Sequence, residues 1–259
     1  MKVAVAGAGG RMGRTLIDLV LAADDLELCG ALEAAGQASV GKEAAPGVRV
    51  TADAAAAIAR AECVIDFSAP AATLAHLDVS AASRVPMVIG TTGFSAQERE
   101  RIAAASQRIP VVLAPNMAVG VNVLFKLAET AAKVLGDAYD VEIIEAHHRH
   151  KVDAPSGTAL RLGEIVAQAL GRDLRKSASH GRQGNTGERG AGAIGFHAVR
   201  GGDIVGEHTV MFAGEGERVE LVVRSTSRAT YALGALRACR FLKGRSPGLY
   251  DMQDVLGLR

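Results

Sequence analysis

The sequence predicts an α/β protein that combines a Rossmann-like, doubly wound parallel sheet with a second α+β domain containing a mixed, mostly antiparallel sheet. Over the first half, short apolar segments alternate with segments of helical periodicity, which is typical of a parallel sheet between two layers of helices. After about residue 118 the pattern changes. Three strand-like segments then follow one another without helices between them, which indicates an antiparallel or mixed sheet.

The individual elements follow from periodicity and from end signals. Ser95 followed by Glu98 has the spacing of a capping box and marks one helix start. In the first part we expect strands at 2–6, 26–33, 63–68, 87–90 and 111–114, and helices at 11–22, 71–82 and 95–106. Further on we expect helices at 119–135, 157–170 and 229–242, strands at 141–146, 194–199, 204–211 and 218–224, and a glycine-rich loop over 181–195.

Composition excludes several classes of protein. The 259 residues suffice for one large domain or two ordinary ones. Because 29 Lys and Arg face 28 Asp and Glu, the net charge is +1, whereas general nucleic-acid binders carry a strong basic excess. Three cysteines far apart in sequence predict a reduced, cytoplasmic chain. No apolar stretch is long enough to span a membrane, so we expect neither a nucleic-acid nor a membrane partner.

The segment VAVAGAGGRMGR leads from the first expected strand into the first expected helix. The strict pattern G-x-G-x-x-G fails because Met12 occupies its last position, but Gly7, Gly10 and Gly13 keep a Gly-x-x-Gly-x-x-Gly spacing. Glycines let the backbone turn tightly and approach a pyrophosphate, and a helix start supplies N–H groups. A tight turn without a ligand would use the same residues. Its position after the first strand, with an acid ending the second, favours a dinucleotide.

That acid is Glu33, where a carboxylate accepts hydrogen bonds from ribose hydroxyls. The next residue is Ala34, so no adjacent cation offsets the repulsion between the carboxylate and a 2′-phosphate. We therefore expect NADH to be used at least as well as NADPH. Arg11 and Arg14 are close enough in sequence to leave use of both cofactors open.

Two further segments follow expected strands, GTTGF at 90–94 and APNMAVGVN at 114–122. Ligands of doubly wound sheets bind at the carboxyl ends of the strands. Small polar side chains such as Thr91, Thr92 and Asn116 are also ordinary turn residues. Taken together, the two segments suit the surroundings of a nicotinamide ring.

Residues 147–151, HHRHK, all carry or can carry positive charge. Three histidines suit zinc, but Arg149 and Lys151 would raise the electrostatic cost of a divalent ion, and we expect no metal. A solvated basic strand end is the plain alternative. A pocket for a small polyanion explains more. Arg and Lys bind carboxylates, His exchanges a proton near neutral pH, and the SGT segment at 156–158 opens a helix whose N–H groups suit a second carboxylate.

Together, GAGGRMGR, GTTGF, APNMAVGVN, EAHHRHKVDAPSGTAL and GDIVGEHTVMF resemble the 4-hydroxy-tetrahydrodipicolinate reductase (dihydrodipicolinate reductase) family of bacterial diaminopimelate and L-lysine biosynthesis. The resemblance covers nearly the whole chain, and the block at 145–160 is its most specific part. It implies reduction of a cyclic imine that bears two carboxylates. Loss of the 4-hydroxyl as water gives a conjugated imine, hydride from NAD(P)H adds at C4, and the resulting enamine takes a proton at C3.

The resemblance also implies roles for individual residues. His147 is similar to the family's acid/base residue and Lys151 to its proton donor, while His148, Gly157 and Thr158 are similar to its substrate contacts. The residues that match the family's cofactor site are Gly7, Ala8, Gly9, Gly10, Arg11, Met12, Glu33, Gly90, Thr91, Thr92, Ala114, Pro115, Asn116 and Met117.

Residues 1–118 and 229–259 are expected to form the dinucleotide-binding domain, and 119–228 the substrate-binding domain. The resemblance implies that the second domain also assembles a homotetramer. Closure of the domains about hinges near 118 and 228 is expected, with the cofactor between them. The alternatives are an NADH-sensing protein without chemistry, a metal-dependent hydrolase built on the histidines, and a dehydrogenase on the same fold that uses another acid.

Overall fold

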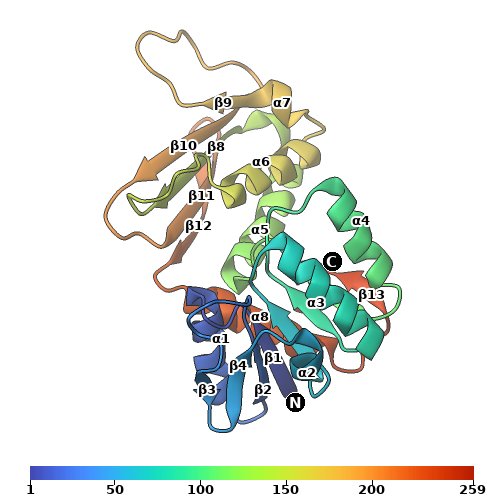
Figure 1. The fold of residues 1–259 in the computed structure, drawn as a ribbon. Coiled ribbons are helices and arrows are strands. Elements are labelled where there is room, and N and C mark those ends of the chain that lie inside the picture. Colours follow the sequence, from blue (N-terminus) through green and yellow to red (C-terminus); the bar gives the residue numbers. More distant parts are fainter. The chain divides into compact units, whose positions relative to one another are not determined.

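The structure is a computed structural model that describes residues 1–259, and the chain divides into two compact units (Figure 1). Unit 1 comprises Met1–Val119 and Ala229–Arg259, and unit 2 comprises Gly120–Arg228. Unit 2 is therefore a single insertion between two parts of unit 1. None of the helices combines the length and the apolar character needed to cross a membrane.

Unit 1 is built on an eight-stranded sheet of order β13-β7-β6-β5-β1-β2-β4-β3. Every neighbouring pair is parallel except β3 with β4. Strand order changes direction between β1 and β5, which is where doubly wound sheets bind ligands. The elements are β1 (Lys2–Ala6), α1 (Arg11–Leu21), β2 (Glu27–Leu32), β3 (Glu43–Ala45), β4 (Val48–Thr51), α2 (Ala54–Ile58), β5 (Cys63–Asp66), α3 (Pro70–Ser83), β6 (Met87–Ile89), α4 (Ala96–Ala105), β7 (Pro110–Leu113), α8 (Ala229–Leu242), β13 (Gly248–Tyr250) and α9 (Met252–Leu256).

Successive residues of β1 enter two separate apolar cores. Val3 and Val5 join the core formed with α1 and α8, whereas Ala4 and Ala6 join the core formed with α2, α3 and α4. The side chains of a strand alternate between the two faces of a sheet, so both faces are covered by helices. The predicted doubly wound sheet is confirmed.

Unit 2 holds a five-stranded sheet of order β12-β11-β8-β10-β9, drawn from light green to orange in Figure 1. β11 is antiparallel to β8 and β12, whereas β10 is parallel to β8 and β9. Its elements are α5 (Val119–Leu135), η1 (Gly136–Ala138), β8 (Asp140–His147), α6 (Gly157–Ala169), α7 (Leu174–Ser177), β9 (Ala178–His180), β10 (Ile194–Arg200), β11 (Gly206–Ala213) and β12 (Arg218–Ser225).

The sheet of unit 2 is mixed, as the sequence predicts, but its parallel share is larger than expected. The chain leaves β8, forms α6 and returns as β10 beside β8, and such a crossover produces parallel strands. The capping box of Ser95 and Glu98 at α4 is confirmed. The segment 43–58, where no element was expected, forms β3, β4 and α2.

Candidate active site

The glycine turn after β1 is tight, and its chain segments pack closely against one another. Gly7 has φ 77°, in the left-handed region that favours glycine. A side chain at Gly13 would overlap the Gly7 carbonyl, and a Cβ at Gly9 would lie 2.5 Å from Ser39 Oγ. Gly10 begins α1 without a side-chain cap, and the first turn of α1 has no acidic residue. These features fit the pyrophosphate of a dinucleotide.

Glu33 follows β2 directly and lies against the glycine turn. Its carboxylate accepts hydrogen bonds from the N–H groups of Gly9 at 2.8 Å and of Ala34 at 2.9 Å. The structure thus brings together the two features that predicted a dinucleotide, the turn and the acid.

The residues after β6 differ in their burial and contacts. Thr91 is buried, and its hydroxyl lies 3.0 Å from the backbone nitrogen of Ser68 and 3.3 Å from Asp66 Oδ1. The Thr91 hydroxyl is therefore engaged inside the protein. Thr92 is exposed at the loop surface. A side chain at Gly90 would overlap the Phe67 ring, so the backbone of this loop is held close to the neighbouring one.

The residues after β7 are also divided between core and surface. Ala114 and Met117 are buried, so Met117 belongs to the core of unit 1 through its side chain. Pro115 is exposed and Asn116 is half-buried. Asn116 Oδ1 accepts the N–H of Ala118 at 2.9 Å. This loop presents backbone rather than apolar side chains at the sheet edge.

In unit 2, the end of β8 carries a buried carboxylate–imidazole pair. Glu145 Oε2 lies 2.6 Å from His147 Nδ1, and both side chains are on the same face because they are two residues apart on one strand. Arg200 donates two hydrogen bonds of 2.7 Å to the same carboxylate. The N–H of Ser156 donates a further one at 3.1 Å. Glu145 and Arg200 were not among the predicted site residues, and Ser156 was named only as part of the helix start at 156–158.

The pKa values of Glu145 and His147 are both lowered. Burial would raise the pKa of Glu145, but hydrogen bonds from Arg200 and His147 outweigh it. Burial lowers the pKa of His147 from its ordinary value of 6.5, and the hydrogen bond to Glu145 only partly opposes this. An ion pair alone would raise the pKa of a histidine. Arg200 already compensates the carboxylate, so a neutral His147 that donates its Nδ1–H to an ionised Glu145 explains both directions.

A second imidazole lies beside this pair. The rings of His147 and His208 are 5.2 Å apart in an edge-to-face arrangement. His208 Nε2 lies 2.9 Å from Ser156 Oγ, which also accepts the N–H of Ala159 and caps α6. Burial lowers the pKa of His208 to about 4, so it is neutral at pH 7. Strand register, which places His208 opposite Glu145, is the signal that could have identified it.

Lys151 is paired with an acid in this structure. Its ammonium donates hydrogen bonds of 2.8 and 2.9 Å to Asp153, and its side chain is 20% exposed. The carbonyl of Asp153 in turn accepts a hydrogen bond from Arg200. The segment after β8 is therefore less cationic than its sequence indicates. A ligand carboxylate would compete with Asp153 for the Lys151 ammonium.

The remaining predicted substrate contacts lie in the same segment. His148 Nδ1 is buried and has no hydrogen-bond partner within the protein. Gly157 and Thr158 form the first turn of α6, with Ser156 as its N-cap. An unpaired imidazole nitrogen and a helix start are both able to bind an anionic group. No three His, Cys, Asp or Glu side chains gather so that they could hold a metal ion.

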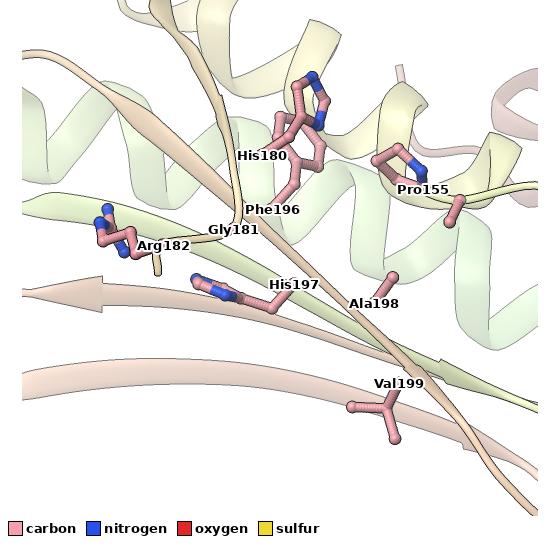
Figure 2. Close-up of a pocket in the computed structure, with 9 residues that line it drawn as sticks. Pro155, His180, Gly181, Arg182, Phe196, His197, Ala198 and Val199 are labelled. Carbon is pink, nitrogen blue, oxygen red and sulfur yellow. The ribbon is translucent and has the colours of Figure 1, made fainter. Parts of the chain in front are cut away.

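The other face of unit 2's sheet carries a similar group of charges. Glu142 accepts hydrogen bonds from Arg182 at 2.7 Å and Arg189 at 2.9 Å, and lies 2.7 Å from His197 Nε2. Arg182 and His197 also line a pocket of about 610 Å³, shown in Figure 2, which reaches Pro155. Both side chains are hydrogen-bonded to Glu142, and the lining includes neither His147 nor Lys151.

The fold and the site together indicate the class of protein. Unit 1 is a dinucleotide-binding sheet with a fitting glycine turn and acid, and unit 2 presents an acid–base group beside a helix start. This is the arrangement of a pyridine-nucleotide-dependent oxidoreductase.

Comparison with known proteins gives the family. Family models described as "Dihydrodipicolinate reductase, N-terminus" and "Dihydrodipicolinate reductase, C-terminus" match residues 1–117 and 120–256. The chain belongs to the dihydrodipicolinate reductase family.

Relatives match over essentially the whole chain. The 4-hydroxy-tetrahydrodipicolinate reductase of Aromatoleum aromaticum is 60% identical, with 100% of this chain and 96% of that protein covered. That of Thiobacillus denitrificans is 59% identical, with 100% and 99% covered. A structure titled "Dipicolinate bound Dihydrodipicolinate reductase from Paenisporosarcina sp. TG-14" superposes with a TM-score of 0.80 at 25% identity, covering 98% of each chain.

Proposed function

We propose that this chain reduces 4-hydroxy-tetrahydrodipicolinate, through the dehydrated imine, to tetrahydrodipicolinate in diaminopimelate and L-lysine biosynthesis. The observation that carries the proposal is the buried Glu145–His147 pair beside Lys151, in a chain that named reductases match over its whole length. A sensing protein would need the glycine turn but gives no reason for this pair.

The cofactor is held by unit 1. Gly7–Met12 cradle the pyrophosphate, Glu33 accepts the ribose hydroxyls, and the backbones of 90–92 and 114–117 face the nicotinamide. Support comes from the start of α1 at Gly10, which has no side-chain cap, and from the position of Glu33 against the glycine turn. When bound, the reduced nicotinamide supplies the hydride.

The substrate's two carboxylates are held by unit 2. One is bound by the first turn of α6 at Gly157 and Thr158, and the other by Lys151 and His148. The partnerless His148 Nδ1 and the Ser156-capped helix start support this arrangement. Nearby cations stabilise the negative charge that develops in the ring during reduction more than they stabilise the ground state.

His147 and Lys151 carry out the proton transfer. An ionised carboxylate can only accept, so Glu145 fixes the His147 proton on Nδ1 and leaves a lone pair on Nε2. With its pKa lowered, His147 is an acceptor at neutral pH, and the Lys151 ammonium is the proton source for C3. A proton from solvent, taken up at His147 Nε2 and passed to the neutral Lys151 amine, then restores the ammonium.

The proposal extends to the choice of cofactor. Glu33 is followed by Ala34, and its carboxylate would repel a 2′-phosphate, so NADH is used at least as well as NADPH. The ratio of kcat/KM values for the two cofactors tests this. Ala34→Arg is expected to shift that ratio towards NADPH by about tenfold, as one charge-assisted hydrogen bond would. An unchanged ratio would show that position 34 does not contact the 2′-group.

The reaction itself is tested by absorbance at 340 nm with freshly made 4-hydroxy-tetrahydrodipicolinate and either cofactor. We expect substrate-dependent oxidation of NADH, insensitive to chelators. Binding of NADH without oxidation would favour the sensing protein. Loss of activity with a chelator would favour a metal enzyme.

We propose further that the enzyme works in the cytoplasm as a homotetramer joined through unit 2. The open face of its sheet supports this, because Val199 and Val222 are 49% and 41% exposed there. Light scattering at micromolar concentration should give four copies of the 26.7 kDa chain. A monomer mass would contradict it.

A further inference from the structure

Asp66 is a carboxylate that none of the predicted roles uses. It ends β5, where it pairs with Ala6 of β1 and Ile89 of β6, and it is 0% exposed. It therefore lies at the point where the strand order of unit 1 changes direction. A fully buried carboxylate is costly unless hydrogen bonds compensate it, so its partners indicate what it does.

Four side chains compensate Asp66. Its Oδ1 accepts hydrogen bonds from the hydroxyls of Ser68 at 2.6 Å, Thr73 at 3.1 Å and Thr91 at 3.3 Å. Its Oδ2 lies 2.7 Å from His76 Nδ1. Thr73 and His76 belong to α3, whereas Ser68 and Thr91 belong to the loops after β5 and β6. One carboxylate thus connects a helix to two loops at the carboxyl edge of the sheet.

Thr91 ties these two loops to each other. Its hydroxyl also accepts the backbone N–H of Ser68 at 3.0 Å and lies 2.8 Å from the hydroxyl of Thr73. The Phe67 ring occupies the space that a side chain at Gly90 would need. The backbone at 90–92 is consequently fixed against the loop at 67–68, with Asp66 below both.

We propose that Asp66 is a positioning residue for the nicotinamide half of the cofactor, acting through Thr91 and the loop at 90–92. The inference rests on the proposed function, in which this loop faces the nicotinamide. It predicts that loss of Asp66 weakens binding of the nicotinamide half of the cofactor and leaves binding of the adenosine diphosphate half unchanged. The adenosine diphosphate half is held by the glycine turn and Glu33, and neither hydrogen-bonds to the Asp66 group.

The test compares two ligands on the full-length chain. NADH contains the nicotinamide, and ADP-ribose lacks it. Asp66→Asn keeps the shape of the side chain but places an amide where one carboxylate oxygen was, and Thr91→Val removes the hydroxyl at constant volume. Thr91→Ser is the conservative rescue. Asp78→Asn is the matched control, because Asp78 lies on α3 but is exposed and bonds only Arg101.

Fluorescence titration with NADH and calorimetry with ADP-ribose measure the dissociation constants. For Asp66→Asn and Thr91→Val we expect NADH to bind about tenfold more weakly, as loss of a charge-assisted hydrogen bond would give, with ADP-ribose unchanged. Thr91→Ser and Asp78→Asn should bind both ligands like the wild type. Should Asp66→Asn not fold, Thr91→Val decides alone.

Equal weakening of both ligands, or of neither, would overturn the inference and show that Asp66 only supports the core. Neither result would contradict the proposed function, because the wild type would still bind and oxidise NADH. A wild-type chain that binds neither ligand would overturn the proposed function, and this inference with it.

Discussion

Two glutamates on β8 lie three residues apart, on opposite faces of one sheet, and each is buried with arginine and histidine partners. Glu145 is bonded to Arg200 and His147. Glu142 has side-chain relative exposure of 10% and carries two arginines and a histidine of its own. The residue types are the same, yet only the Glu145 group is proposed to do chemistry.

Position explains the difference. His147 ends β8, where the chain turns towards Lys151 and the start of α6, so its ring has ligand-binding groups within its own segment. His197 lies within β10 and its carboxylate partner holds the loop at 181–193 through Arg182 and Arg189. A carboxylate–imidazole pair becomes an acid–base group only where other groups can hold a substrate beside it.

The largest expected effect is on kcat, and it should distinguish His147 from His197. His147→Gln should lower kcat by roughly 10²–10⁴-fold, the usual contribution of an acid–base residue. His197→Gln, the matched control, should leave kcat within about twofold, since its partner Glu142 is also bonded by two arginines. Steady-state assay at 340 nm gives both values. Equal losses in the two variants would remove the distinction.

Unfolding at low pH tests how much the charge of Glu142 stabilises the folded chain. Burial would raise its pKa, but hydrogen bonds from Arg182, His197 and Arg189 lower it from 4.5 to about 2. The ionised form is thus preferred in the folded chain, and its stabilisation, about 3 kcal/mol, is complete above pH 4.5 and lost as the pH falls towards 2. Urea unfolding at pH 6 and pH 2.5 measures it.

The matched variant is Glu142→Gln. The wild type should be the more stable of the two at pH 6, and the difference should shrink at pH 2.5. A difference that is independent of pH would show that the charge of Glu142 contributes nothing, and that only its shape matters.

A smaller effect on turnover is expected from the other glutamate. Glu145→Gln keeps an acceptor but loses the charge that fixes His147 and Arg200, so kcat should fall roughly ten- to a hundredfold, the cost of a hydrogen bond to a charged group. Glu142→Gln should not change kcat. If Glu145→Gln were as active as the wild type, Glu145 would not orient the catalytic imidazole.

The sequence predicted the structural features that depend only on residues close together along the chain. Gly7, Gly10 and Gly13 predicted the tight turn between β1 and α1, Ser95 and Glu98 the start of α4, and alternation the doubly wound sheet. It also located the segment containing His147, because unusual residue types are concentrated there.

Contacts between distant segments were not predictable. Arg200 reaches Glu145 across 55 residues, and only the register of β10 on β8 places it there. The Asp66 group likewise needs β5, α3 and β6 in their final order. The Lys151–Asp153 pair is different, because the two residues are only two positions apart and the sequence shows both, yet the charge of Asp153 was not counted against the basic segment.

The most direct test of the account follows the hydrogens of the product. With substrate and NADH carrying deuterium at both positions of nicotinamide C4, in ordinary water, we expect tetrahydrodipicolinate with one deuterium at C4 and a solvent hydrogen at C3. NMR and mass spectrometry distinguish the two carbons. Solvent hydrogen at C4, or a product without deuterium, would contradict it.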